Sequence, residues 1–160
     1  MKNLVILGAG TAGTMMANHL RSKLNKDQWN ISIVDQYKTH YYQPGFLFLP
    51  FDIYTEDQVK KDGKKFLPKG VNYILKKIEQ IFPEENKVQL EDETLNYDLL
   101  IIATGSKIAP EETEGMKGKN WHKNVFDFYT YEGALALRNK LREFKGGKVI
   151  VHFTEMPIKC

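Results

Sequence analysis

Three glycines and one acid near the amino terminus have the types and spacing of a phosphate-binding loop. Gly8, Gly10 and Gly13 follow a predicted strand at 3–7, and Asp35 closes the next predicted strand, roughly twenty residues further on. The first glycine permits a tight turn, the second lets the backbone approach a pyrophosphate, and the third lets the next helix pack closely. The N-terminus of that helix then faces the phosphates, and the acid accepts ribose hydroxyls. The pattern predicts a dinucleotide site, with an ordinary βαβ unit as the alternative.

A second candidate lies far along the chain, where Ala103, Thr104 and Gly105 follow the apolar run 99–102. A continuous apolar run bounded by turn residues predicts a parallel strand that is buried on both faces. Small residues at its carboxyl end lie where open α/β sheets bind ligands. Taken alone, the same residues fit an ordinary turn between a strand and a helix equally well.

The elements that must position these residues follow the order of an α/β protein. Apolar runs predict strands at 3–7, 31–34, 71–75 and 99–103, and periodic apolar residues predict a helix from Met15 to Leu24. Short segments separated by turns predict an antiparallel meander at 78–82, 87–90 and 94–97. The remaining predictions are a helical stretch at 60–66, a polar linker at 107–130, an amphipathic helix at 132–144 and a strand at 148–153.

The GxGxxG loop and the Ala-Thr-Gly turn together resemble the FAD domain of the two-dinucleotide-binding flavoprotein disulfide reductase superfamily. The resemblance implies a Rossmann-like FAD-binding domain, a parallel sheet with a β-meander, in residues 1–106. It makes 107–130 a linker and 131–160 the start of a second Rossmann-like domain. By the same resemblance, the 160 residues are the N-terminal piece of a longer protein and are not expected to turn over alone.

The last predicted strand and the segment after it distinguish between the families of this superfamily. In pyridine-nucleotide-dependent relatives this strand leads into a second glycine-rich loop, whereas residues 148–160 contain no glycine, which argues against NAD(P)H at this position. The turn Thr154-Glu155-Met156-Pro157-Ile158-Lys159-Cys160 is similar to that of sulfide:quinone oxidoreductases and the related flavocytochrome c sulfide dehydrogenases. The loop Tyr41-Tyr42-Gln43-Pro44 is similar to that family too.

Cys160 is the only cysteine of the chain. A lone cysteine is usually a small buried hydrophobe, but here Lys159 would favour its thiolate. The family resemblance implies a redox cysteine at the flavin, paired with a cysteine outside this chain. That pair accepts sulfide as a persulfide, and two electrons pass through the flavin to a quinone.

The resemblance also implies the other site residues. FAD would be bound by the loop and helix start, the acidic strand end, the aromatic loop, the start of the meander and the second turn. These residues are Gly8, Gly10, Thr11, Ala12, Gly13, Asp35, Gln36, Gln43, Pro44, Ile78, Ala103, Thr104 and Gly105. Among the four histidines, none has metal-ligand spacing, and no metal is predicted. His40 stands out because the resemblance brings its loop near the flavin.

Composition excludes some partners and leaves two rival functions. The net charge of +3 comes from dispersed lysines without a dense basic stripe, so nucleic acid is not a predicted partner. The sequence predicts no signal peptide and no transmembrane helix, and the resemblance implies peripheral membrane association, with homo-oligomerisation left open. One rival is an NADH:quinone oxidoreductase of the type II class or another pyridine-nucleotide flavoprotein. The other is a nonenzymatic FAD- or NAD-binding sensor module.

Overall fold

The computed structural model describes residues 1–153 and divides the chain into two compact units. The first unit contains Met1–Tyr42 and Lys60–Ser106, and the second contains Gln43–Val59 and the described part of Lys107–Cys160. Each unit is therefore formed from two separate stretches of sequence. The predicted domain division at residues 106 and 130 stays a prediction about the whole protein.

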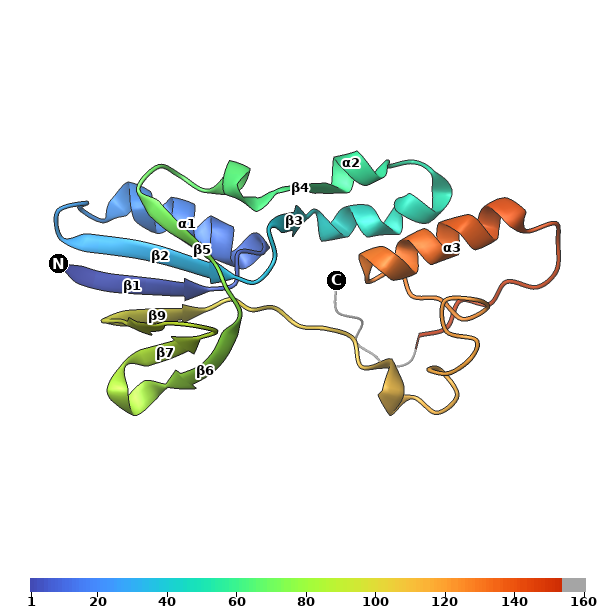
Figure 1. Ribbon diagram of the computed structural model, residues 1–160. Coiled ribbons are helices and arrows are strands. Elements are labelled where there is room, and N and C mark those ends of the chain that lie inside the picture. Colours follow the sequence, from blue (N-terminus) through green and yellow to red (C-terminus); the bar gives the residue numbers. More distant parts are fainter. Residues whose placement is uncertain (154–160) are drawn as a thin grey trace. The chain divides into compact units, whose positions relative to one another are not determined.

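A parallel four-stranded sheet forms the centre of the first unit (Figure 1). Its strand order is β5 (Val71–Leu75), β2 (Trp29–Asp35), β1 (Lys2–Leu7) and β9 (Leu99–Ile102). The helix α1 (Thr11–Lys23) connects β1 to β2 as a crossover, which parallel neighbours require. The predicted α/β fold with a Rossmann-like parallel sheet is confirmed.

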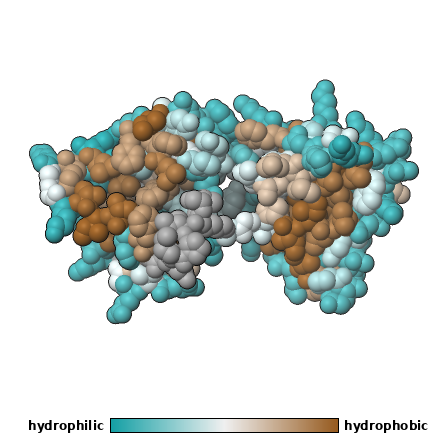
Figure 2. Space-filling model, turned by 180° about the vertical axis from the view of Figure 1, so that it is seen from behind, coloured by the Kyte–Doolittle hydropathy of each residue, from teal (hydrophilic) through white to brown (hydrophobic). Residues whose placement is uncertain are grey.

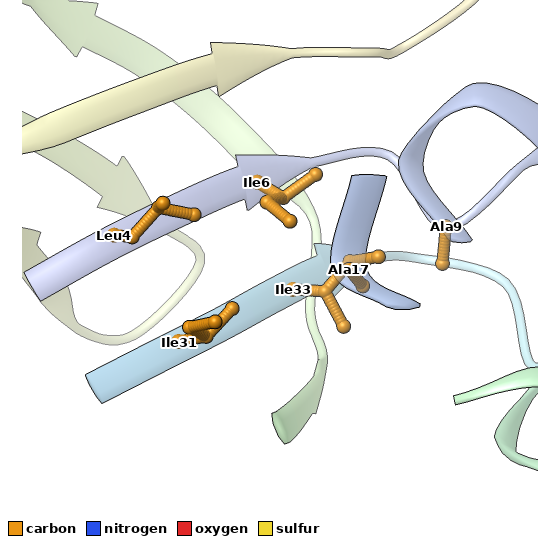
Figure 3. Close-up of a cluster of buried hydrophobic side chains, with 6 residues drawn as sticks. All are labelled: Leu4, Ile6, Ala9, Ala17, Ile31 and Ile33. Carbon is orange, nitrogen blue, oxygen red and sulfur yellow. The ribbon is translucent and has the colours of Figure 1, made fainter. Parts of the chain in front are cut away.

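The two faces of the sheet are covered by different elements. Leu4 and Ile6 of β1 and Ile31 and Ile33 of β2 pack against Ala17 of α1 on one face (Figure 3). The alternate residues, Val5, Leu7 and Val34, pack on the other face against Val88 and Leu90. Because successive strand residues point to opposite faces, burial of both faces requires a continuous apolar run. This is why residues 4–7 of β1 are Leu-Val-Ile-Leu.

The second covering layer is an antiparallel meander of three strands, β6 (Ile78–Phe82), β7 (Lys87–Leu90) and β8 (Thr94–Asn96). Its strands were predicted from the sequence, and β8 ends one residue early. The central strand β7 alternates between buried Val88 and Leu90 and less buried Lys87 and Gln89. This alternation is typical of a strand with one covered face.

The predicted helix at 60–66 is wrong in part. Residues Lys60–Asp62 form β4, which pairs antiparallel with β3 (Thr39–Tyr41), and only Gly63–Phe66 forms a 3₁₀ helix. The N–H of Gly63 donates to the carbonyl of Lys38 at 2.8 Å, and the Asp62 side chain accepts from the N–H of Lys64 at 3.0 Å. These bonds order the segment against β3, and tertiary pairing outweighs the helix propensity of the lysines, which Gly63 in the middle of the run already lowers.

The prediction that the strand at 99–103 is buried on both faces is also wrong. In the described part of the chain β9 lies at the edge of the sheet and pairs only with β1. Leu99 is 46 % exposed and Ile102 is 62 % exposed. An apolar run reports the preference of its side chains for burial, while the exposure of a strand also depends on its neighbours. Apolar surface is visible on both parts of the molecule (Figure 2).

The second unit is organised around α3 (Tyr131–Glu143), which agrees with the predicted helix at 132–144. The Thr130 side chain caps this helix by accepting from the N–H of Gly133 at 3.0 Å. Ala134 of α3 is fully buried against apolar residues of 43–59, a stretch that contains 3₁₀ helices at Gln43–Leu47 and Leu49–Phe51 and the helix α2 (Glu56–Val59). Arg138 of α3 also donates to Glu56 of α2 at 2.9 Å.

The predicted strand at 148–153 is not formed in the structure. These residues have no assigned secondary structure, and Val149 and Ile150 are 63 % and 77 % exposed. A strand exists only when a neighbouring strand supplies hydrogen bonds, and the described part of the second unit contains no sheet that could receive one. The predicted turn that follows, residues 154–160, lies outside the described residues.

Candidate functional site

Gly8 and Gly13 hold the start of α1 close to the sheet. Gly8 has a φ of +96°, a conformation that favours glycine, and a Cβ on it would collide with the carbonyl group of Ala103. A Cβ on Gly13 would collide with the carbonyl oxygen of Gly8. The absence of these two side chains is therefore required by the fold itself.

Gly10 differs from both of these glycines. Its φ is −72°, and a Cβ built on it would meet no atom within 4 Å. Gly10 is the N-cap of α1, and its carbonyl accepts from the N–H and hydroxyl of Thr14 at 3.0 and 2.9 Å. The N–H groups of the first turn have no partner inside a helix. The fold would accept a side chain at position 10. A phosphate that approaches these N–H groups needs this position to be without one.

Asp35 ends β2 beside this loop. Its Oδ2 accepts from the N–H of Ala9 at 2.7 Å, and its Oδ1 accepts from the N–H of Tyr37 at 2.8 Å. The sequence predicted a ribose ligand at this position and gave no sign of the two backbone bonds. Each carboxylate oxygen accepts more than one hydrogen bond, so Asp35 holds the loop and retains capacity for hydroxyl donors.

The Ala-Thr-Gly turn reaches the same end of the sheet. The N–H of Ala103 donates to the carbonyl of Leu7 at 2.7 Å, which places the turn directly beside Gly8. Thr104 and Gly105 are exposed, and Gly105 has a φ of +73°. The structure thus brings together, at the carboxyl ends of β1, β2 and β9, two segments that lie far apart in the sequence.

The remaining predicted residues lie in different places. Thr11 and Ala12 are exposed in the first turn of α1, and Gln36 is exposed immediately after Asp35. Ile78 starts β6 and packs into the apolar layer between the sheet and the meander.

Two of the predicted residues lie in the second unit, and one lies outside the described residues. Gln43 and Pro44 belong to the second unit, where Gln43 donates to the carbonyl of Tyr129 at 3.3 Å. Cys160 lies outside the described residues, so its role as a catalytic residue stays a prediction.

His40 makes a contact that sequence reasoning missed. Its Nδ1 lies 3.0 Å from the carbonyl oxygen of Ala9, and its ring lies 4.5 Å from that of Phe66, measured between centroids. The sequence drew attention to His40 only through its aromatic loop. No local pattern signals a hydrogen bond to a residue 31 positions earlier.

Tyr73 of β5 lies under the segment that joins β2 to β3. Its hydroxyl donates to the carbonyl of Tyr37 at 3.0 Å. Burial raises the pKa of this phenol, and the negative charges of Asp35 and Asp62 raise it further. Deprotonation would place a third negative charge near the two carboxylates, so the phenol stays neutral and keeps donating.

The arrangement fits a dinucleotide better than a metal. It offers an unobstructed backbone at Gly10, free N–H groups at a helix N-terminus and a carboxylate at the next strand end. Within residues 1–153, no three His, Cys, Asp or Glu side chains are grouped so that they could hold a metal ion. Over the same residues, no helix has the length and apolar character needed to cross a membrane.

Comparison with known proteins agrees with this geometry. Residues 2–151 match the family model described as pyridine nucleotide-disulphide oxidoreductase. The chain is 30% identical over 149 residues to the mitochondrial sulfide:quinone oxidoreductase of Dictyostelium discoideum, covering 92% of this chain and 33% of that protein. It is 28% identical over 124 residues to the type II NADH:quinone oxidoreductase of Staphylococcus haemolyticus, covering 73% of this chain and 29% of that protein.

Comparison with solved structures leads to the same family. The X-ray structure of the sulfide:quinone oxidoreductase from Aquifex aeolicus is similar with a TM-score of 0.73 and 26% identity, covering 89% of this chain and 32% of that one. The chain thus spans about a third of the length of the relatives that it matches. The predicted resemblance to sulfide:quinone oxidoreductases and the predicted cofactor, FAD, are confirmed. With its glycine loop, acidic strand end and adjoining Ala-Thr-Gly turn on one sheet edge, the chain belongs to the pyridine nucleotide-disulphide oxidoreductase family.

Proposed function

We propose that the whole protein is a flavin-dependent oxidoreductase that oxidises sulfide to sulfane sulfur or polysulfide and passes two electrons to a quinone. The observation that carries the proposal is the segment 148–160, which lacks glycine and ends in Cys160. A pyrophosphate needs a bare backbone turn, so this segment does not suit a nicotinamide nucleotide. Similarity to sulfide:quinone oxidoreductases supports the same function.

The residues of the first unit would hold the cofactor. The N–H groups of Gly10, Thr11 and Ala12 would bind the pyrophosphate, and Asp35 would accept the ribose hydroxyls. Thr104 and Gly105 would form the opposite wall, and Gln36 and Ile78 would supply further contacts. Gln43 and Pro44 belong to the second unit, and their role in FAD binding stays a prediction. When bound, FAD supplies two-electron redox chemistry that amino-acid side chains lack.

Cys160 would handle sulfur as one member of a cysteine pair whose partner lies outside this chain. Hydrosulfide attacks the oxidised pair, so that one sulfur–sulfur bond forms, the bond between the cysteines breaks, and the released cysteine leaves as a thiolate. The products are a persulfide on one cysteine and a thiolate on the other. Re-forming the oxidised pair releases the added sulfur two electrons more oxidised than sulfide, and the quinone takes up those electrons with two protons.

The first test uses the full-length, FAD-loaded protein under anaerobic conditions. Hydrosulfide should bleach the flavin absorbance at about 450 nm rapidly, whereas NADH and NADPH should act far more slowly. Rapid bleaching by NADH without a response to sulfide would overturn the proposal.

The second test replaces Cys160. Cys160→Ala should keep bound FAD and lose most sulfide-dependent quinone reduction, because the thiol that carries sulfur is removed. A cysteine that only packs would be replaced at little cost to turnover. Mass spectrometry of the untreated protein should find Cys160 with extra sulfur or bridged to another cysteine. Normal sulfide oxidation by a folded, FAD-loaded Cys160→Ala variant would remove Cys160 from the mechanism.

A type II NADH:quinone oxidoreductase is the second candidate. It is favoured by the 28% identity to the Staphylococcus haemolyticus protein, which covers a smaller part of this chain than the sulfide:quinone oxidoreductase from Dictyostelium does. Both functions use a quinone, a lipid-soluble substrate, so we also propose peripheral association with a membrane. The anaerobic comparison of sulfide with NADH separates the two candidates.

A further inference from the structure

His40 is held firmly beside the glycine loop. It lies in β3, where it pairs with Lys61 of β4, and its half-buried ring packs against Phe66. The carbonyl of Lys38, two residues earlier, accepts from the N–H of Gly63. The position of the imidazole is therefore set by backbone pairing on one side and by ring packing on the other.

The contact between His40 and Ala9 has a defined direction. A carbonyl oxygen can only accept, so the Nδ1 atom at 3.0 Å must carry the proton. Both the neutral imidazole with its proton on Nδ1 and the charged imidazolium satisfy this condition. His40 thus donates to the Ala9 carbonyl in either protonation state.

This hydrogen bond also orients Gly10. The Ala9 carbonyl and the Gly10 N–H belong to one planar trans peptide, so they point in opposite directions. Asp35 holds the preceding peptide through the Ala9 N–H at 2.7 Å. Two consecutive peptides of the loop are each held by one side chain, and a Cβ built on Gly10 would meet no atom within 4 Å.

We propose that His40 is a positioning residue that fixes the Ala9–Gly10 peptide, so that the Gly10 N–H is aimed at the pyrophosphate of the dinucleotide. The inference rests on FAD binding by this loop and goes beyond it, since it gives a role to a side chain that does not itself touch the phosphate. Without the hydrogen bond the peptide is free to rotate, and binding must then restrict it.

The test measures dissociation constants with the full-length apoprotein for FAD, ADP and AMP. His40→Phe keeps a ring against Phe66 and removes the donor, and it should weaken binding of FAD and ADP roughly tenfold, the effect of one hydrogen bond. AMP has no pyrophosphate, so its binding should change little. His40→Asn places an amide donor near the Nδ1 position and should restore most of the FAD affinity. His19→Phe, on the exposed part of α1, is the matched control and should change nothing.

Three results would overturn the proposal. The first is wild-type affinity for FAD and ADP in His40→Phe. The second is an equal loss of AMP and ADP binding, and the third is an equal loss of FAD affinity in the Phe and Asn variants. Either equal loss would indicate a general disturbance of the fold, which has no selectivity for the pyrophosphate or for the hydrogen-bond donor. The ratio of ADP to AMP affinity and the ratio of FAD affinity between the Phe and Asn variants remain decisive if His40→Phe lowers the melting temperature. Failure of the wild-type protein to bind FAD would instead refute the cofactor assignment on which the inference rests.

Discussion

The two ends of the parallel sheet use polar side chains in different ways. At the amino end, the Asn72 side chain donates to that of Asn30 at 2.9 Å, and the Asn30 side chain donates to that of Asn3 at 3.2 Å. The Asp98 carboxylate accepts from the backbone N–H of Asn3 at 2.6 Å. These side chains mainly satisfy one another across neighbouring strands.

At the carboxyl end the polar side chains hold backbone instead. Asp35 accepts two backbone N–H groups, and His40 donates to a backbone carbonyl. The N–H groups of the first turn of α1 are left for a partner outside the helix. The difference teaches that an end whose polar side chains bind each other serves the fold. An end whose side chains order a loop and leave the N–H groups at the start of a helix without an intrahelical partner is prepared for a ligand.

The largest effect is expected from Gly13→Ala. The added Cβ would collide with the Gly8 carbonyl oxygen, and we expect the free energy of unfolding of the apoprotein to fall by about 3 kcal/mol. Urea denaturation measures this loss. Gly118→Ala is the control, since a Cβ there meets no atom within 4 Å. Equal stability of the two variants would contradict the packing described at the loop.

The comparison is sharpest for a pair of carboxylates, Asp35 and Asp98, each of which accepts a backbone N–H at one end of the sheet. Asp35→Asn should raise the dissociation constant of FAD more than about tenfold, because a charged acceptor is lost near the ligand. Asp98→Asn should lower stability and leave FAD affinity unchanged. Isothermal titration of both variants checks this, and similar affinities would remove the distinction between the two ends.

Asn30 tests the amino end directly. Asn30→Ala removes two side-chain hydrogen bonds, and we expect stability to fall by about 2 kcal/mol without a change in FAD binding. Thermal and urea unfolding give the first quantity, and fluorescence titration gives the second. Weaker FAD binding in this variant would mean that the amino end also serves the ligand.

The smallest effect concerns pH and Tyr73. Because the pKa of this phenol is raised in the folded protein, its contribution to stability is present below the ordinary value of about 10 and is lost as the pH rises through the higher folded value. Tyr73→Phe should be less stable than the wild type by about 1 kcal/mol at neutral pH. The difference should shrink above pH 10, as measured by urea unfolding across that range. A constant difference would show that the ionisation of Tyr73 is not linked to folding.

The local sequence pattern was enough to predict the elements whose structure depends on the type and spacing of their own residues. The glycine loop, the buried strand β1 and the amphipathic α3 each follow from spacing and polarity. The three-residue strands β3 and β4 were missed, because so short a segment has no readable period and forms only by pairing. The exposure of β9 was missed because it depends on which strands lie beside it.

The site was predictable to the same extent. The sequence was enough to predict that Gly8, Gly10, Gly13 and Asp35 lie together at one loop, since a dinucleotide loop constrains residue types at fixed spacing, and their contacts with FAD stay a prediction. The bonds of Ala9 to Asp35 and His40 were not, because they join residues 26 and 31 positions apart through side-chain orientation alone. Cys160 was proposed from the sequence and lies outside the described residues.

Gly10→Val tests the central claim most directly, that the carboxyl end of the sheet is kept open for a dinucleotide. The φ of Gly10 is ordinary and its Cβ direction is empty, so the apoprotein should fold with a melting temperature within a few degrees of the wild type. Branched methyl groups at the N-cap would occupy the path of the pyrophosphate, and FAD should be lost from the purified protein, with affinity at least about a hundredfold weaker. A folded Gly10→Val protein that retains full flavin occupancy would contradict the account.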